Sequence, residues 1–328
     1  MAKVPVGILT GFLGSGKTTV LSHLLPRPAF SNAIVIINEF GEISIDHLIV
    51  ASLSESIVEL RNGCLCCTVR EDLVMTLRDL HRQRQLGEIK AFDRVLVETS
   101  GLADPVPLLH TLMTNPPLQT GYVIDTVVTV VDALNGVATV AAHPTAADQI
   151  ALADLIVLSK LDLVTPAVTA AVTACVTGLN SQAPVLTQTD LLANPAQLFG
   201  AQRFNPALRT GAVTQWLAHH SGEAHVHHAH RYQQLVIRHP GAISLAGLSV
   251  FLNQAVNQQR AQILRIKGIA GAREKGGKPV LVHAVQNKFY PLQWLPAWPD
   301  EDESCRLVFI GRDLDASLLE ERFQALCV

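Results

Sequence analysis

The fold is decided by one short stretch, Gly11-Phe12-Leu13-Gly14-Ser15-Gly16-Lys17-Thr18. It fits the phosphate-loop pattern G-x-x-x-x-G-K-[ST], follows the apolar run Val4–Thr10 and opens a segment with helical periodicity. In such a loop the backbone N–H groups close around a β-phosphate, Lys17 reaches the β- and γ-phosphate oxygens, and the Thr18 hydroxyl holds Mg²⁺. The stretch therefore predicts a nucleoside triphosphate site with these nucleotide-binding residues: Gly11, Gly14, Ser15, Gly16, Lys17, Thr18 and Thr19.

Apolar, β-branched runs recur along the first 200 residues, with helical or irregular segments between them. They lie at Val4–Thr10, Ala33–Ile37, Ile57–Leu60, Arg94–Glu98, Thr126–Asp132, Asp154–Ser159 and Val185–Thr187. Several are apolar throughout, which is typical of parallel strands covered on both sides. We therefore expect residues 1–200 to form an α/β domain, a P-loop NTPase parallel sheet with helices on both faces.

The remainder of the chain divides into two parts. Residues 201–230 contain Pro206, Gly211, Gly222 and many histidines, and we expect a histidine-rich linker. Residues 231–328 predict a smaller α+β domain with strands and helices at Gln233–Arg238, Leu245–Ala255, Ile263–Gly268, Pro279–Val285, Arg306–Ile310 and Ala316–Leu326. Its basic group, which includes Arg265 and Lys267, is expected to be a solvated face, with a docking surface for an acidic client as the alternative.

Composition narrows the function classes. The chain has 328 residues, of which 48% are hydrophobic and 16% charged, and its net charge is -3. A disordered chain is excluded, and there is no basic footprint for nucleic acid. No apolar run is long enough to span a membrane, and the first apolar stretch runs into the phosphate loop. We expect a cytoplasmic protein with neither nucleic acid nor membrane as a partner.

Two more strand ends carry chemistry. Glu98 ends a buried strand, where it would act on magnesium through a bound water, and Gly101 follows as a sensor of the γ-phosphate. The second is Ser159-Lys160-Leu161-Asp162, in which Asp162 can accept both donors on the Watson–Crick edge of guanine. Serine stands here where asparagine is usual. The predicted catalytic residues are Lys17, Thr18, Glu98 and Gly101, and the predicted base-binding residues are Ser159, Lys160 and Asp162.

Cysteines and histidines indicate a second kind of site. Cys64, Cys66 and Cys67 can converge if Gly63 turns the backbone sharply, and such thiolates suit Zn²⁺ or Cu(I). A closed structural site and unligated buried thiols stay open as alternatives. Six of the 13 histidines fall within residues 219–230, and we include His225, His227, His228 and His230 as metal ligands, against the alternative of a solvated polar linker. The scattered Cys175, Cys305 and Cys327 are expected to be small hydrophobic residues.

These motifs, in this order, resemble those of the CobW-like metallochaperone GTPases, relatives of the nickel-insertion GTPases of urease and hydrogenase maturation. The resemblance also rests on Asn38-Glu39-Phe40-Gly41-Glu42 and on residues 98–105, and it covers nearly the whole chain. It implies a GTPase with GTP, Mg²⁺ and Zn²⁺ and delivery of metal to a client metalloprotein. The sequence offers no clear water-orienting glutamine or arginine finger, and we therefore expect slow intrinsic hydrolysis. Glu42 joins the three cysteines as a candidate metal ligand.

Several alternatives remain at this point. One is a zinc-storage or zinc-sensing module with nucleotide as a regulatory ligand, and another is a cobalt chaperone for cobalamin synthesis. A P-loop kinase gives no role to the cysteine cluster or to Asp162. A homodimer is left open as a partner. We also hypothesise that GTP–Mg²⁺ orders residues 39–46 and 99–105 and so couples nucleotide state to metal affinity, by about 1–3 kcal/mol.

Overall fold

The computed structural model describes residues 3–38, 57–59, 68–195, 198, 232–289 and 292–328. The chain folds into two compact units, Met1–Thr177 with Ala183–Phe204, and Gly178–Gln182 with Asn205–Val328. The first unit holds the phosphate loop. The predicted linker at residues 201–230 lies outside the described residues, so its boundaries and those of the two predicted domains stay predictions.

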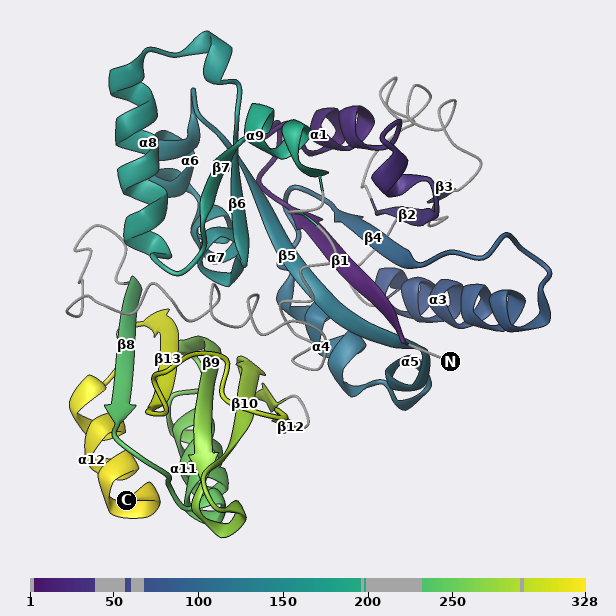
Figure 1. The fold of residues 1–328 in the computed structure, drawn as a ribbon. Helices are drawn as coiled ribbons and strands as arrows, with labels where there is room; N and C mark the ends of the chain where they lie inside the picture. Colours follow the sequence, from purple (N-terminus) through teal and green to yellow (C-terminus); the bar gives the residue numbers. More distant parts are fainter. Residues whose placement is uncertain (1–2, 39–56, 60–67, 196–197, 199–231, 290–291) are drawn as a thin grey trace. The chain divides into compact units, whose positions relative to one another are not determined.

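The first unit is built on a seven-stranded parallel sheet in the order β3-β2-β4-β1-β5-β6-β7 (Figure 1). Its strands are β1 (Val4–Thr10), β2 (Ala33–Asn38), β3 (Ile57–Glu59), β4 (Arg94–Thr99), β5 (Tyr122–Asp132), β6 (Leu155–Ser159) and β7 (Val185–Thr187). The predicted parallel α/β sheet is confirmed. Most strand ends agree with the sequence analysis to within one residue, because buried parallel strands are apolar along their whole length.

Strand β5 is longer than predicted. It begins at Tyr122, four residues before the expected start at Thr126, although Asp125 lies in this stretch. The register against β1 shifts between Val6 and Ile8, opposite Ile124 and Val127. This irregularity accommodates Asp125 without ending the strand, and Asp125 is buried.

Helices cover both faces of this sheet, as predicted. They are α1 (Lys17–Leu24), α3 (Thr68–Leu86), α4 (Val106–Thr114), α5 (Pro116–Gly121), α6 (Gly136–Ala142), α7 (Pro144–Leu152), α8 (Pro166–Leu179) and α9 (Gln188–Ala193), with short 3-10 helices at Pro28–Phe30 and Leu161–Leu163. Helices α1 and α9 share a core with strands β1, β2, β4, β5 and β6. Helices α4, α5 and α7 contact β5, and α3 packs beside α4 and α5.

The parallel arrangement positions the site. In a parallel sheet all strands end at the same edge, and ligands of open α/β sheets bind there. The loops that follow β1, β4, β5 and β6 therefore meet at the carboxyl edge of the sheet, although they come from distant parts of the sequence.

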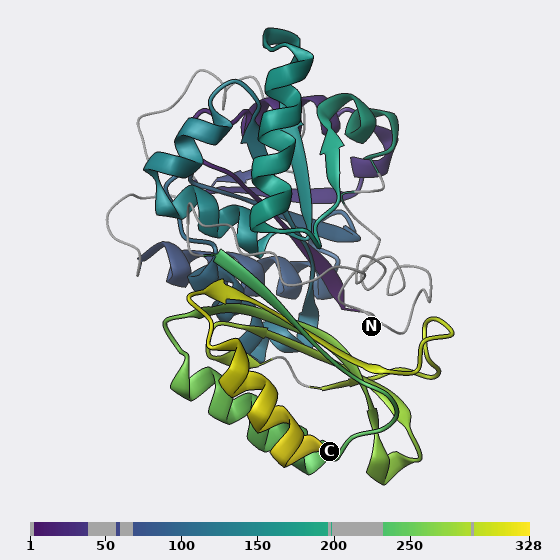
Figure 2. The same ribbon diagram turned by 90° about the vertical axis from the view of Figure 1, so that its left-hand side faces the viewer.

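The second unit is an antiparallel sheet in the order β11-β10-β9-β13-β8, with β12 paired to β10. Its elements are β8 (Tyr232–His239), α11 (Leu245–Gln258), β9 (Ile263–Ala272), a 3-10 helix (Arg273–Lys275), β10 (Lys278–Val285), β11 (Lys288–Phe289), β12 (Gln293–Trp294), β13 (Cys305–Arg312) and α12 (Ala316–Cys327). Figure 2 shows α11 and α12 together on one face of this sheet. The predicted α+β architecture is confirmed.

The expectation of a solvated basic face is wrong for two residues. Arg265 and Lys267 are only 1% and 6% exposed. They lie on β9, which has β10 on one side and β13 on the other, and the Arg265 Nε donates to Nε2 of the buried His283 at 3.2 Å. The other basic residues of this group, Arg273, Lys275 and Lys278, are exposed as predicted. All residues of this central strand are buried whatever their charge, and hydrophobicity alone could not reveal this.

The scattered thiols fit the sequence analysis. Cys305 and Cys327 are buried in the core that α11 and α12 form with the sheet, and Cys175 is half-buried in α8. Burial raises the pKa of both core thiols to about 12. They stay protonated near neutral pH and act as small apolar side chains.

Among the described residues, none of the helices combines the length and the apolar character that crossing a membrane demands.

Candidate nucleotide site

The phosphate loop connects the end of β1 to the start of α1. Gly11, Gly14 and Gly16 have φ angles of 141°, 69° and 89°. A Cβ on Gly11 would lie 2.3 Å from the carbonyl oxygen of Val130, so both the backbone conformation and the space require glycine there. The chain thus turns tightly enough to expose backbone amides at the N-terminus of α1, as the motif predicts.

Lys17 and Thr18 begin helix α1 directly after this loop. Lys17 is 8% exposed, and its Nζ donates to the carbonyl oxygen of Gly11 at 2.9 Å. The ammonium group therefore lies inside the curve of the loop. This is the position from which a lysine can exchange a carbonyl partner for phosphate oxygens.

Glu98, near the end of β4, contacts Thr18 in the first turn of α1. The Thr18 Oγ1 donates to Glu98 Oε1 at 2.9 Å, and Glu98 is 3% exposed. The two residues are neighbours because β1 pairs with β4, with Leu9 opposite Glu98. One residue further along, the Thr99 hydroxyl donates to the Thr10 hydroxyl at 2.9 Å. A hydroxyl and a carboxylate, both hard oxygen donors, thus stand together beside the phosphate loop, and this donor set fits Mg²⁺.

Ser159 connects the loop after β6 to the phosphate loop. Its Oγ, buried at the end of β6, lies 2.6 Å from the carbonyl oxygen of Ser15, to which it donates. It also lies 3.3 Å from the carbonyl oxygen of Val131. The serine side chain is shorter than that of the usual asparagine. Even so, the Cβ of Ser159 lies only 3.6 Å from the position that a Cβ on Gly16 would take. The serine that replaces the usual asparagine therefore still links the predicted base-binding loop to the phosphate loop.

Lys160 and Asp162 follow at the surface of this loop. Lys160 takes the left-handed conformation with φ 56°, and Asp162 lies exposed in the 3-10 helix Leu161–Leu163. The Lys160 Nζ donates to Asp132 Oδ2 at 2.8 Å. The lysine is thereby anchored, and the Asp162 carboxylate is accessible to a ligand.

Asp132 is a site residue that the sequence analysis missed. It ends β5, and besides Lys160 it accepts hydrogen bonds from the Asn135 side chain and from the backbone N–H groups of Leu134 and Asn135. Burial acts to raise the pKa of Asp132, but these hydrogen bonds outweigh it and hold the pKa below its usual value. The sequence did contain a pattern that could have indicated Asp132, because this acidic residue ends an apolar strand at the same sheet edge as Glu98.

The loop after β4 packs against the phosphate loop. A Cβ on Gly101 would lie 2.6 Å from the backbone nitrogen of Leu13, so only glycine allows this approach. On its other side, the carbonyl oxygen of Gly101 accepts from Gln149 Nε2 at 3.2 Å. Gln149 is the second residue that sequence reasoning missed. Its signal is a glutamine among the small apolar residues of α7.

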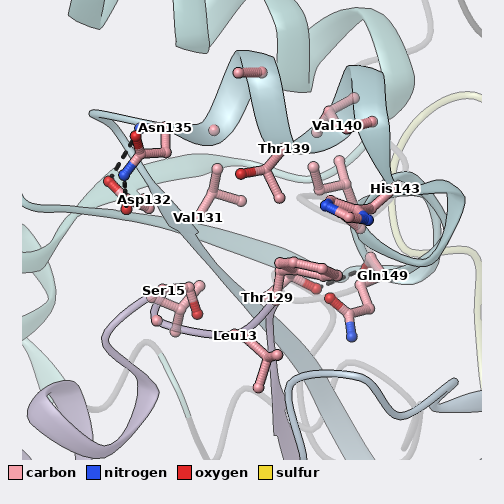
Figure 3. Close-up of a pocket in the computed structure, with 18 of the residues that line it drawn as sticks. Leu13, Ser15, Thr129, Val131, Asp132, Asn135, Thr139, Val140, His143 and Gln149 are labelled. Atoms are coloured by element: carbon pink, nitrogen blue, oxygen red, sulfur yellow. Dashed lines mark hydrogen bonds between the residues drawn. The ribbon is translucent and has the colours of Figure 1, made fainter.

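A cavity of about 490 Å³ adjoins this edge of the sheet (Figure 3). It lies between residues 12–15 of the phosphate loop, the end of β5, and helices α6 and α7. The Phe12 ring stacks on the His143 imidazole, with ring centroids 4.5 Å apart. Lys17, Thr18, Glu98 and Asp162 are not among the lining residues, so the cavity borders the phosphate loop on a flank other than the one that carries the Thr18–Glu98 pair.

Two sequence profiles match the chain. The profile of the CobW/HypB/UreG nucleotide-binding domain matches residues 5–187, and that of the cobalamin synthesis protein cobW C-terminal domain matches residues 232–327. The chain belongs to the CobW/HypB/UreG family. The resemblance drawn from the motifs is thereby confirmed, as is the fold that it implies.

Relatives in this family align with the present chain along nearly its whole length. The zinc chaperone YjiA of Escherichia coli is 30% identical over 331 residues, 99% of both proteins. The zinc chaperone CobW of Pseudomonas aeruginosa is 34% identical over 368 residues, 99% of this chain and 92% of that protein. The crystal structure of the Zn(II)-bound YjiA GTPase from E. coli superposes with a TM-score of 0.72 at 25% identity and covers 99% of each chain.

The predicted metal ligands of this CobW-family chain lie outside the described residues: Glu42, Cys64, Cys66, Cys67, His225, His227, His228 and His230. Within the described ranges, no three or more histidine, cysteine, aspartate or glutamate side chains are grouped so that they could hold a metal ion. The metal site therefore stays a prediction, and its ligands are to be sought in residues 39–67 and 219–230.

Proposed function

We propose that this chain is a GTP-hydrolysing zinc chaperone. The observation that carries the proposal is the meeting of three motifs at one sheet edge, where Thr18 bonds Glu98 and Ser159 bonds the phosphate loop. The relatives aligned along 99% of the chain are named zinc chaperones, which supports zinc as the cargo. The site residues are assigned below as part of this proposal.

The phosphate loop would bind the triphosphate. Its backbone N–H groups and those of the first turn of α1 contact the β-phosphate, and Thr19 lies next in that turn. Lys17 exchanges the Gly11 carbonyl for phosphate oxygens, because a charged oxygen is the better acceptor for an ammonium group. Thr18 would hold Mg²⁺ directly and Glu98 through a bound water, and the ion would neutralise the charge of the β- and γ-phosphates.

The base would lie against the loop after β6. Asp162 accepts the two donors of guanine, and an adenine would present an acceptor there instead. Lys160, anchored on Asp132, holds the shape of the loop. Gly101, packed on Leu13, brings its N–H close to where a γ-phosphate would stand. Removal of that phosphate by water would release the loop and change the affinity for metal.

Zinc is the cargo in this scheme, held by Cys64, Cys66 and Cys67 with Glu42 and the histidine tract as further ligands. Thiolates bind zinc only while they are reduced, which favours the cytoplasm as the compartment. Delivery requires a client metalloprotein. The names of two further relatives, zinc-regulated GTPase metalloprotein activators of Dictyostelium discoideum and Schizosaccharomyces pombe, support a protein client.

The decisive experiment measures zinc affinity by chelator competition, first with GDP and then with a non-hydrolysable GTP analogue. The wild type is compared with Cys66→Ser, and Cys175→Ser serves as the control because Cys175 is a half-buried thiol of α8. We expect a nucleotide-dependent shift of about 5–150-fold in the wild type and the control, and its loss in Cys66→Ser. Tight zinc binding that ignores the nucleotide would make the cluster structural and would contradict the proposal.

A further inference from the structure

Gln149 occupies an unusual place in helix α7. It is 0% exposed, and its neighbours on the buried side of the helix are Ala146, Ala147, Ile150 and Ala151. A primary amide buried among apolar side chains is unfavourable unless it is hydrogen-bonded. An alanine or leucine would fill this position at lower cost, so the bonds that the amide makes are the reason to consider a function for it.

The amide nitrogen holds the loop that follows β4. Gln149 Nε2 donates to the carbonyl oxygens of Gly101 at 3.2 Å and Ala103 at 3.0 Å. Both partners can only accept, so the nitrogen rather than the oxygen of the amide must face them. The main-chain oxygen of Gln149 in turn accepts from the Thr129 hydroxyl at 2.7 Å, which anchors the helix to β5. The loop after β4 is thereby tied to β5 through Gln149.

The amide oxygen is not used in this arrangement. Oε1 is buried and accepts no hydrogen bond from the described part of the chain. Gln149 lines the cavity of about 490 Å³, and Figure 3 shows its side chain beside Thr129 and below His143. The amide is therefore oriented by its donors alone.

The loop that it holds is the one that approaches the phosphate site. Gly101 is confined between Leu13 of the phosphate loop on one side and the Gln149 amide on the other. A shift of the amide would therefore move the Gly101 N–H relative to the phosphate loop. Ala103 is fixed further by a turn, in which its N–H donates to the carbonyl oxygen of Ser100 at 3.0 Å.

Helix α7 also contacts the phosphate loop directly. His143, the residue that precedes the first turn of α7, stacks on Phe12. At its other end the helix leads within three residues into β6, which ends at Ser159. Helix α7 thus contacts the phosphate loop, holds the loop after β4 and leads into β6, where the predicted base-binding loop begins.

We propose that Gln149 is a positioning residue, which holds Gly101 where its N–H meets the γ-phosphate and so lets the site distinguish GTP from GDP. The inference rests on the proposed function, because it requires GTP at the phosphate loop. Gln149 acts through Gly101 and touches neither the nucleotide nor the reacting water. Without its two donors, the loop after β4 would sample positions in which the γ-phosphate has no N–H partner.

The test uses the full chain with Gln149→Leu, which keeps the volume and removes both donors, and Gln149→Met in case the leucine variant does not fold. Gln85→Leu, at an exposed glutamine of α3, is the matched control. We expect the affinity for a GTP analogue relative to GDP to fall about tenfold, and kcat/KM for GTP to fall at least as much, because KM follows the dissociation constant when hydrolysis is slow. GDP affinity should stay at the wild-type value.

A third variant separates positioning from packing. In Gln149→Glu the ionised carboxylate faces two carbonyl oxygens, whereas the protonated acid can donate to one of them. Burial raises the pKa of such a carboxyl. GTP hydrolysis by this variant, relative to the wild type at each pH, should therefore recover as the pH falls from 8 to 6. Gln149→Leu has no group to titrate at this position, so its hydrolysis relative to the wild type should not change with pH.

Two results would overturn the inference. One is an equal loss of GDP and GTP-analogue affinity, which would make Gln149 a packing residue. The other is an unchanged kcat/KM and an unchanged affinity ratio in Gln149→Leu. If the wild type binds nucleotide but does not hydrolyse GTP, the proposed function fails, while the ratio of analogue to GDP affinity still decides the role of Gln149.

Discussion

The Oγ1 of Thr18 donates to Oε1 of Glu98 at 2.9 Å, although the two residues are 80 positions apart in the sequence. The bond joins the first turn of α1 to the end of β4 and puts a hydroxyl and a buried carboxylate side by side. Since both side chains suit magnesium, we propose that nucleotide binding and hydrolysis diverge at this pair, with binding requiring the loop and hydrolysis requiring the carboxylate as well.

The variant Glu98→Gln tests this division. It keeps the shape and an acceptor for Thr18 but removes the charge, so GTP hydrolysis should fall on the order of 100-fold. Nucleotide affinity measured without magnesium should not change. Glu88→Gln is the control, because the Glu88 side chain is 48% exposed. Equal hydrolysis by Glu98→Gln and the wild type would remove Glu98 from the site.

Ser159→Ala removes the hydroxyl that bonds the carbonyl oxygen of Ser15. A buried hydrogen bond is worth about 1 kcal/mol, so GDP affinity should fall about fivefold. A fluorescent GDP analogue in a titration measures this. Ser31→Ala, at an exposed serine, is the control. If the affinity of Ser159→Ala is the same as that of the control, the link between the two loops does not contribute to binding.

Asp162→Asn addresses the choice of base. The carboxylate accepts both donors of guanine, whereas an amide offers one donor and one acceptor, which matches xanthine. We expect GTP affinity to fall about 100-fold and xanthosine triphosphate affinity to rise. Competition between the two nucleotides for wild type and variant provides the measurement. An unaltered preference for guanine would place the base away from Asp162.

The pH dependence of stability follows from Asp132. Because the pKa of Asp132 in the folded protein lies below its ordinary value, the carboxylate stabilises the fold fully above the unfolded-state pKa of about 3.9. That stabilisation is lost as the pH falls through the lower folded-state pKa. Urea unfolding between pH 7 and pH 3 should show a smaller decrease in the free energy of unfolding for Asp132→Asn than for the wild type. Parallel curves for the two proteins would contradict this.

Phe251 tests the second unit on its own. Its ring is 0% exposed and meets Phe309 and Phe323 edge-on, with centroids 5.9 and 5.5 Å away. Phe251→Ala should reduce the free energy of unfolding of this unit by about 3–5 kcal/mol and leave GDP affinity unchanged. Val250→Ala, at a neighbour that is 47% exposed, should change neither. Loss of GDP binding in Phe251→Ala would mean that the two units fold as one.

Much of the molecule could be predicted from local patterns. The ends of the strand Val4–Thr10 were predicted to the residue, because a buried parallel strand is largely apolar and is bounded by turns. The phosphate loop was predicted because each glycine, the lysine and the threonine have a steric or chemical reason for their spacing. The family, and with it the order of the motifs, was also evident in the sequence.

Other features depend on which elements become neighbours, and local sequence does not encode that. The pairing of β1 with β4 brings Thr18 to Glu98, and the pairing of β5 with β6 brings Asp132 to Lys160. The packing of α7 on β5 brings Gln149 to Gly101, and β9 became a central strand that buries Arg265.

The sequence by itself therefore determined the chemistry of each loop and the elements between them, since those depend on near neighbours along the chain. Only the tertiary structure decided which polar groups meet, because hydrogen bonds join atoms that are close in space rather than in sequence.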